Sequence, residues 1–100
     1  MNVNKTVHQV KRSTLPVIIL NQLMNEPTHG YSLLSKLEEH GLTGIKSGTL
    51  YPLLRVMEES GDIESEWEIT DRGPARKTFK ITSQGQTTLQ EVRTWLRQIS

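Results

Sequence analysis

The chain has 100 residues, of which 34% are hydrophobic and 23% are charged, and its formal net charge at pH 7 is +1. These values predict one globular domain and exclude a disordered chain. The absence of cysteine excludes a disulfide framework and a Cys-based zinc site. The longest apolar run, residues 15–20, is far shorter than the roughly 20 residues that a membrane-spanning helix needs, and no export signal precedes it. We therefore expect a cytoplasmic protein without a metal site, a cofactor or a membrane segment.

The first third of the chain predicts two helices after a polar segment. Residues 1–12 are polar and carry three basic side chains, so we expect them to be only partly ordered. A helix is expected over residues 14–25, because Pro16 fits a first turn and the segment is apolar on most sides. A second helix, opened by Thr28, is expected over residues 29–40. Its predicted core residues are Tyr31, Leu33, Leu34 and Leu37.

The third helix, expected over residues 47–60, has two different faces. Ser47 or Thr49 is expected to cap it, Pro52 favours a late start, and Gly61 ends it. The buried stripe has the spacing i, i+3, i+4, i+7 and consists of Leu50, Leu53, Leu54 and Met57. The opposite face carries Gly48, Pro52, Arg55 and Glu59, with Tyr51 at its flank. This outward face is small, polar and cationic near its start, as a helix that enters a groove requires.

The hydrophobic period then changes from 3.6 to 2, which predicts a β-hairpin. A half-buried strand over residues 63–69 is expected to face the core with Ile63, Trp67 and Ile69. A turn follows over residues 70–75, and a second strand runs over residues 76–81. Folding about Gly73 would pair Trp67 with Phe79 on one face. On the other face it would pair Glu66 with Lys80.

Charge is segregated along this hairpin. Residues 58–68 hold six acidic side chains and no base, whereas residues 72–80 hold four basic side chains and no acid. The basic residues are Arg72, Arg76, Lys77 and Lys80, and we expect them to contact phosphates. The alternative is a solvated hairpin with cross-strand ion pairs, which would explain Lys80 but not Arg76 and Lys77.

The last helix is expected to be capped by Thr82 and to run for about seventeen residues to the C-terminus. Its apolar stripe consists of Leu89, Val92, Leu96 and Ile99, flanked by Trp95. Leaving four aliphatic side chains in water would forgo about 6–12 kcal/mol, comparable with the whole stability of a domain, ~5–15 kcal/mol. We therefore expect a two-fold dimer through this stripe, which also uses the first helix around residues 15–19.

Three helices followed by a two-stranded hairpin make a winged helix-turn-helix, and at this point the chain resembles the PadR family of bacterial transcriptional regulators. The matching segments cover about residues 15–85 in the family's order. They are Pro-Thr-His-Gly-Tyr at 27–31, Ser-Gly-Thr-Leu-Tyr-Pro-Leu-Leu-Arg at 47–55, Glu58, Gly61, Ile63, Trp67-Glu68, Gly-Pro-Ala-Arg-Lys at 73–77 and Ile-Thr-Ser-Gln-Gly at 81–85. The predicted fold is α+β, mainly α, with a winged-helix DNA-binding domain over residues 1–81 and a dimerisation helix over residues 82–100.

The resemblance implies a dimeric, ligand-responsive repressor, and the two-fold symmetry of the expected homodimer calls for a palindromic operator. With a single helix after the wing, the chain is similar to the short PadR subgroup, some members of which resemble multidrug sensors. A tryptophan on the last helix of such members lines an apolar ligand cleft at the dimer centre, and Trp95 stands at that position. We expect Leu15 and Ile18 to join it in binding a small hydrophobic or planar aromatic effector. The alternative is that Trp95 is simply part of the interface core.

The residues expected to bind DNA come from two elements. Hydroxyls and backbone amides at a helix N-terminus suit phosphate oxygens, and a long polar side chain can reach a base edge. From the third helix and its approach these are Lys46, Ser47, Thr49, Tyr51 and Arg55; from the hairpin they are Arg72, Arg76 and Lys77. The alternative for Tyr51 is that it packs on the surface of the domain.

Two other classes of function fit the sequence less well. An enzyme is not expected, because His8, His29 and His40 lie in separate segments with no nucleophile–base or metal-ligand spacing. The stronger rival is a winged helix used as a protein-interaction module, since the net charge is low and Val56 replaces a residue that is often basic in the family. Salt dependence separates the two, because binding through several phosphates weakens steeply with salt.

Overall fold

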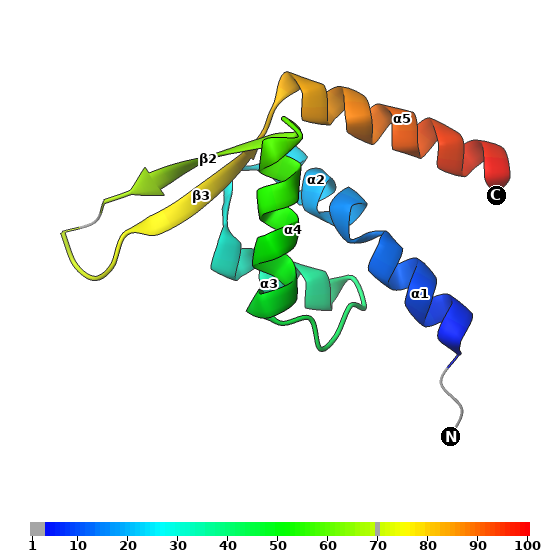
Figure 1. The fold of residues 1–100 in the computed structure, drawn as a ribbon, viewed down its shortest axis with the longest axis horizontal. Helices are drawn as coiled ribbons and strands as arrows, with labels where there is room; N and C mark the ends of the chain where they lie inside the picture. Colours follow the sequence, from blue (N-terminus) through cyan, green and yellow to red (C-terminus); the bar gives the residue numbers. More distant parts are fainter. Residues whose placement is uncertain (1–3, 70) are drawn as a thin grey trace.

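The computed structural model describes residues 4–69 and 71–100. The helices are α1 (Lys5–Ser13), α2 (Leu15–Asn25), α3 (Gly30–Glu39), α4 (Ser47–Glu59) and α5 (Ser83–Ile99), and the strands are β1 (Thr28–His29), β2 (Ile63–Glu68) and β3 (Arg76–Ile81) (Figure 1). The strands form an antiparallel sheet in the order β1-β3-β2. The arrangement confirms the predicted α+β winged helix. The turn predicted over residues 70–75 includes Thr70, which lies outside the described residues, as do residues 1–3 of the N-terminal segment.

The hydrophobic core is built around α2. Ile19 is fully buried, and Leu33 of α3 and Leu54 of α4 are each 1% exposed. The sheet adds Phe79, and α5 adds Leu89. Leu50, Leu54 and Met57 are buried and Leu53 packs against the core, so the apolar stripe predicted for the third helix is confirmed.

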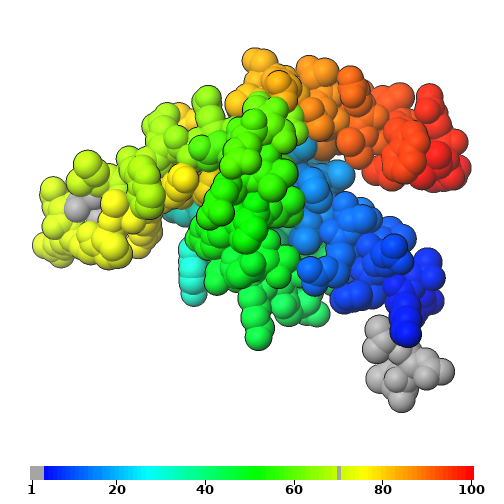
Figure 2. Space-filling model, viewed as in Figure 1, coloured from blue at the N-terminus to red at the C-terminus, as the bar shows by residue number. Residues whose placement is uncertain are grey.

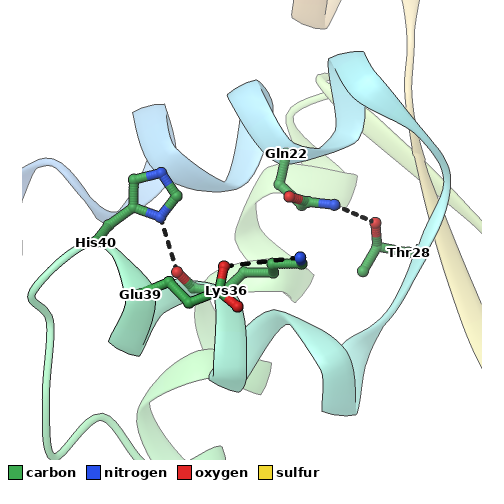
Figure 3. Close-up of polar contacts among 5 residues, drawn as sticks. All are labelled: Gln22, Thr28, Lys36, Glu39 and His40. Atoms are coloured by element: carbon green, nitrogen blue, oxygen red, sulfur yellow. Dashed lines mark hydrogen bonds and ion pairs between the residues drawn. The ribbon is translucent and has the colours of Figure 1, made fainter.

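The connection from α2 to α3 is held by Thr28, which lies in β1 and is 7% exposed. Its hydroxyl accepts a hydrogen bond from Gln22 Nε2 at 3.1 Å and donates one to the Glu26 carbonyl at 3.0 Å. At the other end of α3, the His40 ring is bonded to the Lys36 carbonyl at 2.8 Å, and Lys36 pairs with Glu39 (Figure 3). The expectation that Thr28 opens the second helix is wrong, because pairing with β3 takes its backbone and His29 becomes the N-cap residue.

The N-terminal segment contains a helix that the sequence analysis did not predict. Residues 5–13 form α1, which is capped by the Asn4 side chain accepting from the Val7 amide at 3.2 Å. None of its described residues is buried, and Val7 and Val10 remain 47% and 55% exposed. The sequence signal for this helix was the capping residue Asn4 followed by two valines three residues apart.

Helix α4 begins at Ser47, earlier than Pro52 suggested. Lys46 is the N-cap residue, and its side chain makes no capping hydrogen bond to any described residue, so the predicted caps Ser47 and Thr49 are wrong. Pro52 lies inside the helix. The amide that proline lacks would have bonded to the Gly48 carbonyl, and both residues are exposed, so water can take the place of that bond.

The wing, β2 and β3 with their connecting turn, differs from the predicted register by two residues. Ser65, not Trp67, lies opposite Phe79, and Trp67 lies opposite Lys77. Each side chain keeps its predicted face because a shift of two preserves the alternation. Lys80 still pairs with Glu66, now across a diagonal, with Nζ 2.9 Å from Oε1.

Three large apolar side chains predicted to be buried are exposed. Ile63 is 2% exposed, but Trp67 is 66% and Ile69 is 91% exposed. Tyr31, predicted to face the core from α3, is 79% exposed. For Trp67 and Ile69 the physical reason is the projection of the wing: the far part of β2 extends away from the helices (Figure 1), so the inward face of the strand has no core to cover it there. Tyr31 instead lines a hollow between α3 and the wing.

The final helix confirms the predicted cap and length. Thr82 accepts from the Gly85 amide at 3.0 Å and donates to the Gly61 carbonyl at 2.6 Å, which joins the start of α5 to the end of α4. Asp62 accepts from Thr88 at 2.8 Å and from Gln84 at 3.1 Å. Farther along, the Arg93 guanidinium donates to the Asn21 side chain of α2. None of the described helices is long and apolar enough to cross a membrane.

Candidate nucleic-acid interface

Helix α4 and the wing lie side by side and share one face of the molecule (Figure 1). Helix α4 presents Tyr51 and Arg55 on its exposed side. The wing presents Arg76, which is exposed, and Lys77, which is partly buried. The predicted recognition helix and the predicted basic hairpin therefore meet.

Tyr51 is held in place by Gly30, the first residue of α3. A Cβ built on Gly30 would lie 2.8 Å from the Tyr51 hydroxyl oxygen and 2.9 Å from Cε1. Only a residue without a side chain leaves room for this ring. The tyrosine is nevertheless 40% exposed. Both readings of Tyr51 weighed above thus have a basis: the ring packs on the domain surface, and its edge remains available to a ligand.

A cleft of about 330 Å³ separates α4 from the wing. We call it the α4–wing cleft. Tyr51, Arg55 and Lys77 line it, together with Glu58 and Glu59. Glu58 also accepts a hydrogen bond from Ser65 at 2.8 Å, which ties the end of α4 to β2.

Lys77 is positioned by two aromatic rings. Its Nζ lies 5.7 Å from the centroid of Trp67 and 5.7 Å from that of Phe79. A cation at this distance is attracted to the ring faces. The ammonium group is therefore held at the junction of α4 and the wing, and the stem of the wing is stiffened by the same contact.

Lys80 forms an ion pair with Glu66 on the outer face of the wing. Its hydrogen bond to Glu66, and then the attraction of the two charges, raise the pKa of Lys80. The cross-strand ion pair weighed above therefore accounts for Lys80. Arg76 and Lys77 make a separate group, because they line a hollow in which Lys80 has no part among the described lining residues.

That hollow, of about 540 Å³, lies between the start of α3, Tyr51 of α4 and the wing. We call it the α3–wing groove. Its wing side is formed by Trp67, Arg76 and Lys77, and its helix side includes Tyr31 and Tyr51. Tyr51 and Lys77 also line the α4–wing cleft, so the two hollows are neighbours that share a wall.

The other predicted DNA-binding residues are placed less closely together. Lys46 and Ser47 are exposed and Thr49 is partly exposed, all at the start of α4. Arg72 is exposed in the turn of the wing. These four residues are not among the described residues that line the two hollows.

Three residues of this face were not singled out for DNA binding by the sequence. The sequence predicts Tyr31 and Trp67 for the core, and it gives His29 no part in binding. In the structure His29 joins the body to the wing: Nδ1 lies 3.0 Å from the Thr78 hydroxyl and Nε2 lies 3.4 Å from Glu68 Oε2. The alternation of exposed charges along β2 gave no sign that its aromatic residue would also be exposed.

The residues expected to form a dimer or to bind an effector differ in how far the protomer buries them. Leu89 is 1% and Leu15 is 5% exposed, so both belong to the core of the protomer and offer little surface to another molecule. Val92, Leu96 and Ile18 are partly buried. Trp95 and Ile99 are 56% and 60% exposed. The first half of the stripe packs on α2, and the second half remains open.

No group of three or more His, Cys, Asp or Glu side chains in residues 4–69 and 71–100 is arranged to hold a metal ion.

Comparison with known proteins gives a consistent result. The model of the transcriptional regulator PadR-like family matches residues 19–91. The transcriptional regulator Rv3488 of Mycobacterium tuberculosis is 31% identical over 94 residues, which cover 94% of this chain and 86% of that protein.

Solved structures agree in sequence and in fold. A PadR family transcriptional regulator from Eggerthella lenta is 36% identical, with a TM-score of 0.86 over 95% of this chain and 82% of that one. A PadR-like transcriptional regulator from Bacillus cereus is 33% identical, with a TM-score of 0.81 over 91% and 88% of the two chains. The family match begins within α2 and ends within α5, so it includes α3, α4 and the wing, which build the face described above. The chain belongs to the PadR-like family of transcriptional regulators.

Proposed function

We propose that this regulator is a repressor that binds a palindromic DNA operator as a homodimer and that a small hydrophobic or planar aromatic molecule modulates its affinity for DNA. The observation that carries the proposal is the shared face of α4 and the wing. On it, Tyr51 and Arg55 of the helix lie beside Lys77 of the wing around a single cleft. A helix of this kind fits the major groove, and a basic hairpin beside it suits the neighbouring phosphates.

The expected role of each DNA-binding residue follows from the length and the hydrogen-bonding groups of its side chain. Lys46, Ser47 and Thr49 at the start of α4 supply an ammonium group and hydroxyls for phosphate oxygens. Arg55 is the side chain best suited to a base edge, since it is exposed and can donate two parallel hydrogen bonds. Arg72, Arg76 and Lys77 hold the backbone on the wing side.

Dimerisation rests on the open half of α5. The helix projects beyond the body, and a notch separates its C-terminal half from α1 (Figure 2). Its exposed or partly exposed apolar residues there are Val92, Trp95, Leu96 and Ile99. At about 1.5–3 kcal/mol for each large apolar side chain buried, a second copy that covers them gains several kcal/mol. A two-fold axis would present two α4 helices roughly one DNA turn apart, which calls for a palindrome.

The effector site is proposed at Trp95. Its ring borders an open groove of about 360 Å³ on the outer side of α5, also lined by Gln98. Apart from Trp95, the described residues that line this groove are polar, and Ile18 of α2 lies outside that lining; Ile18, which is partly buried, would contact an effector there only when a second copy of the chain brings it to the groove. If a ligand and DNA favour different spacings of the two wings, each weakens the binding of the other by the same factor. This function implies the bacterial cytoplasm, where the DNA lies.

The test is selection of bound fragments from genomic DNA, combined with sedimentation of the purified protein. The proposal predicts recovery of a palindromic sequence and a mass of two chains. Recovery of fragments with no common symmetric sequence, from a protein that sediments as one chain at micromolar concentration, contradicts it.

A second candidate is a winged helix that binds another protein. It is favoured by one observation: the α4–wing cleft is lined by Glu58 and Glu59 as well as by bases, and Val56 nearby on α4 is 57% exposed. DNA binding through several phosphates falls linearly in log affinity against log salt, whereas a mainly apolar protein contact changes little. A flat salt response of the selected partner would favour this candidate.

A further inference from the structure

The α3–wing groove gathers most of the aromatic side chains of the protein. Of the five aromatic residues in the chain, Tyr31, Tyr51 and Trp67 line this hollow, and each comes from a different element. It is also larger than the neighbouring α4–wing cleft, about 540 Å³ against about 330 Å³. Such a concentration of aromatic side chains requires an explanation.

Packing within the protomer does not explain it. Tyr31 is 79% exposed and Trp67 is 66% exposed, so both present most of their surface to solvent. They lie on opposite sides of the groove, Tyr31 on α3 and Trp67 on the wing. Large apolar surface that lines a concave site is typical of binding sites rather than of an ordinary wet surface.

The charge of the groove selects an anion. The described residues that line it include two permanent cations, Arg76 and Lys77, and no carboxylate. The nearby Glu68 is directed to His29, with 3.4 Å between Oε2 and Nε2. Cations interleaved with exposed aromatic rings suit a nucleotide, whose phosphate is charged and whose sugar and base are partly apolar.

We infer that the α3–wing groove binds one nucleotide unit of the DNA backbone, as a contact separate from the face of α4 that enters the major groove. Arg76, Lys77 and the hydroxyl of Tyr31 take the phosphate, and the deoxyribose packs on Trp67. Duplex DNA is the occupant because the groove shares Tyr51 and Lys77 with the α4–wing cleft and thus continues the same surface. The inference rests on the proposed DNA-binding function and adds Tyr31 and Trp67 to the interface.

The experiment uses the full chain and a fluorescein-labelled duplex of mixed sequence, about three helical turns long, with anisotropy measured at low salt. Tyr31→Phe removes one hydroxyl and is expected to weaken binding about threefold to tenfold. Trp67→Ala removes the apolar surface on which the sugar packs and also the ring that holds Lys77, and it is expected to weaken binding about tenfold. The matched control is Ser35→Ala, which removes an exposed hydroxyl one turn farther along α3, outside the described lining of the groove, and is expected to stay within about twofold of the parent.

A second measurement follows Trp67 directly. In a Trp95→Phe protein the only remaining indole is Trp67. Its emission is expected to change when the duplex is added and to return when salt releases the DNA. This signal is obtained without any substitution in the groove itself.

The outcomes separate the inference from the function on which it rests. If the parent binds the duplex while Tyr31→Phe and Trp67→Ala bind it equally well and the Trp67 emission is constant, the inference is wrong and the proposed function stands. If the parent does not bind duplex DNA at any salt concentration, both are wrong. Selective weakening in the two variants, with the Ser35→Ala protein unchanged, supports the inference.

Discussion

Tyr51 of α4 lies directly against Gly30 of α3, with its hydroxyl oxygen 2.8 Å and its Cε1 2.9 Å from the position that a Cβ on Gly30 would occupy. The contact joins the start of one helix of the helix-turn-helix to the exposed side of the other. Real Cβ atoms do not approach other heavy atoms so closely, so the orientation of Tyr51 depends on the absence of a side chain at residue 30.

Gly30→Ala is therefore expected to move the Tyr51 ring rather than to unfold the protein. The atoms in the way belong to the far end of the Tyr51 side chain, which can rotate, and alanine is as good as glycine or better in a helix. We expect the melting temperature to change little and the affinity for duplex DNA to fall about threefold or more, as when one hydrogen bond is lost. Anisotropy titration and thermal melting give the two values.

A double-mutant cycle provides the control. In a Tyr51→Ala background the added methyl group has no ring to displace, so Gly30→Ala should then leave DNA affinity unchanged. An equal loss of affinity in both backgrounds would show that Gly30 acts without Tyr51.

Replacing Arg76 and Lys77 together by alanine is expected to reduce the salt dependence of DNA binding. Each phosphate contact contributes about 0.9 to the slope of log affinity against log salt, so the slope should become shallower by about 1–2 per protomer. The matched control is Lys11→Ala with Arg12→Ala, an adjacent pair of bases on α1, outside the described face of α4 and the wing. Equal slopes in the two double variants would contradict the assignment of the wing.

The general architecture was predictable because burial follows periodicity. The stripe of α4 and the cap of α5 at Thr82 depend on local spacing, and both are confirmed. The exposure of Trp67 was not predictable in the same way. Alternation tells which face of an element is apolar, but whether the protein covers that face depends on how far the element projects.

The register of the wing shows a second limit. The strands pair Ile63 with Ile81, so the hairpin turns around residue 72 rather than Gly73. Pairing aromatic residues with each other favoured the wrong alignment, since the contact of Lys77 with the ring of Trp67 also stabilises the hairpin. The third strand, β1, has only two residues, too few for a period to be visible.

Gly85→Ala is expected to destabilise the fold strongly. A Cβ at this position would lie 2.0 Å from the Asp62 carbonyl oxygen and 2.7 Å from Ile81 Cγ1. Because the first obstacle is backbone, the start of α5 must move away, and we expect a loss in unfolding free energy of about 3 kcal/mol or more. Urea denaturation measures it.

Gly48→Ala is the appropriate control, because it makes the same substitution in a helix where no atom lies within 4 Å of the new Cβ. Stability there is expected to stay the same or to rise by about 0.5–1 kcal/mol. A similar loss in both variants would mean that the close packing at Gly85 is not the cause.

Leu96→Ala combined with Ile99→Ala is expected to dissociate the proposed dimer. At about 1.5–3 kcal/mol for each side chain, the dissociation constant should rise about 100-fold or more. Leu89→Ala provides the contrast: Leu89 is 1% exposed in the protomer, so its truncation should lower the stability of the fold by about 2–5 kcal/mol. Sedimentation equilibrium and urea denaturation distinguish the two effects. A double variant that remains dimeric would show that α5 is not the interface.

Trp95→Ala is expected to abolish binding of a planar aromatic cation such as proflavine. In a Trp67→Phe protein, where Trp95 is the remaining indole, the dye should quench the emission saturably, because flat rings stack on an exposed indole. The affinity of the Trp95→Ala protein is then measured from the anisotropy of the dye itself. An affinity equal to that of the parent would remove Trp95 from the proposed effector site.

One residue, Thr82, separates the last strand of the wing from α5, and its hydroxyl is bonded to the Gly61 carbonyl at the end of α4. The connection between β3 and α5 is therefore too short to absorb a relative movement of the two elements. A change in the tilt of α5 must either move the wing with it or break the hydrogen bond between Thr82 and Gly61, which links α5 to the end of the recognition helix.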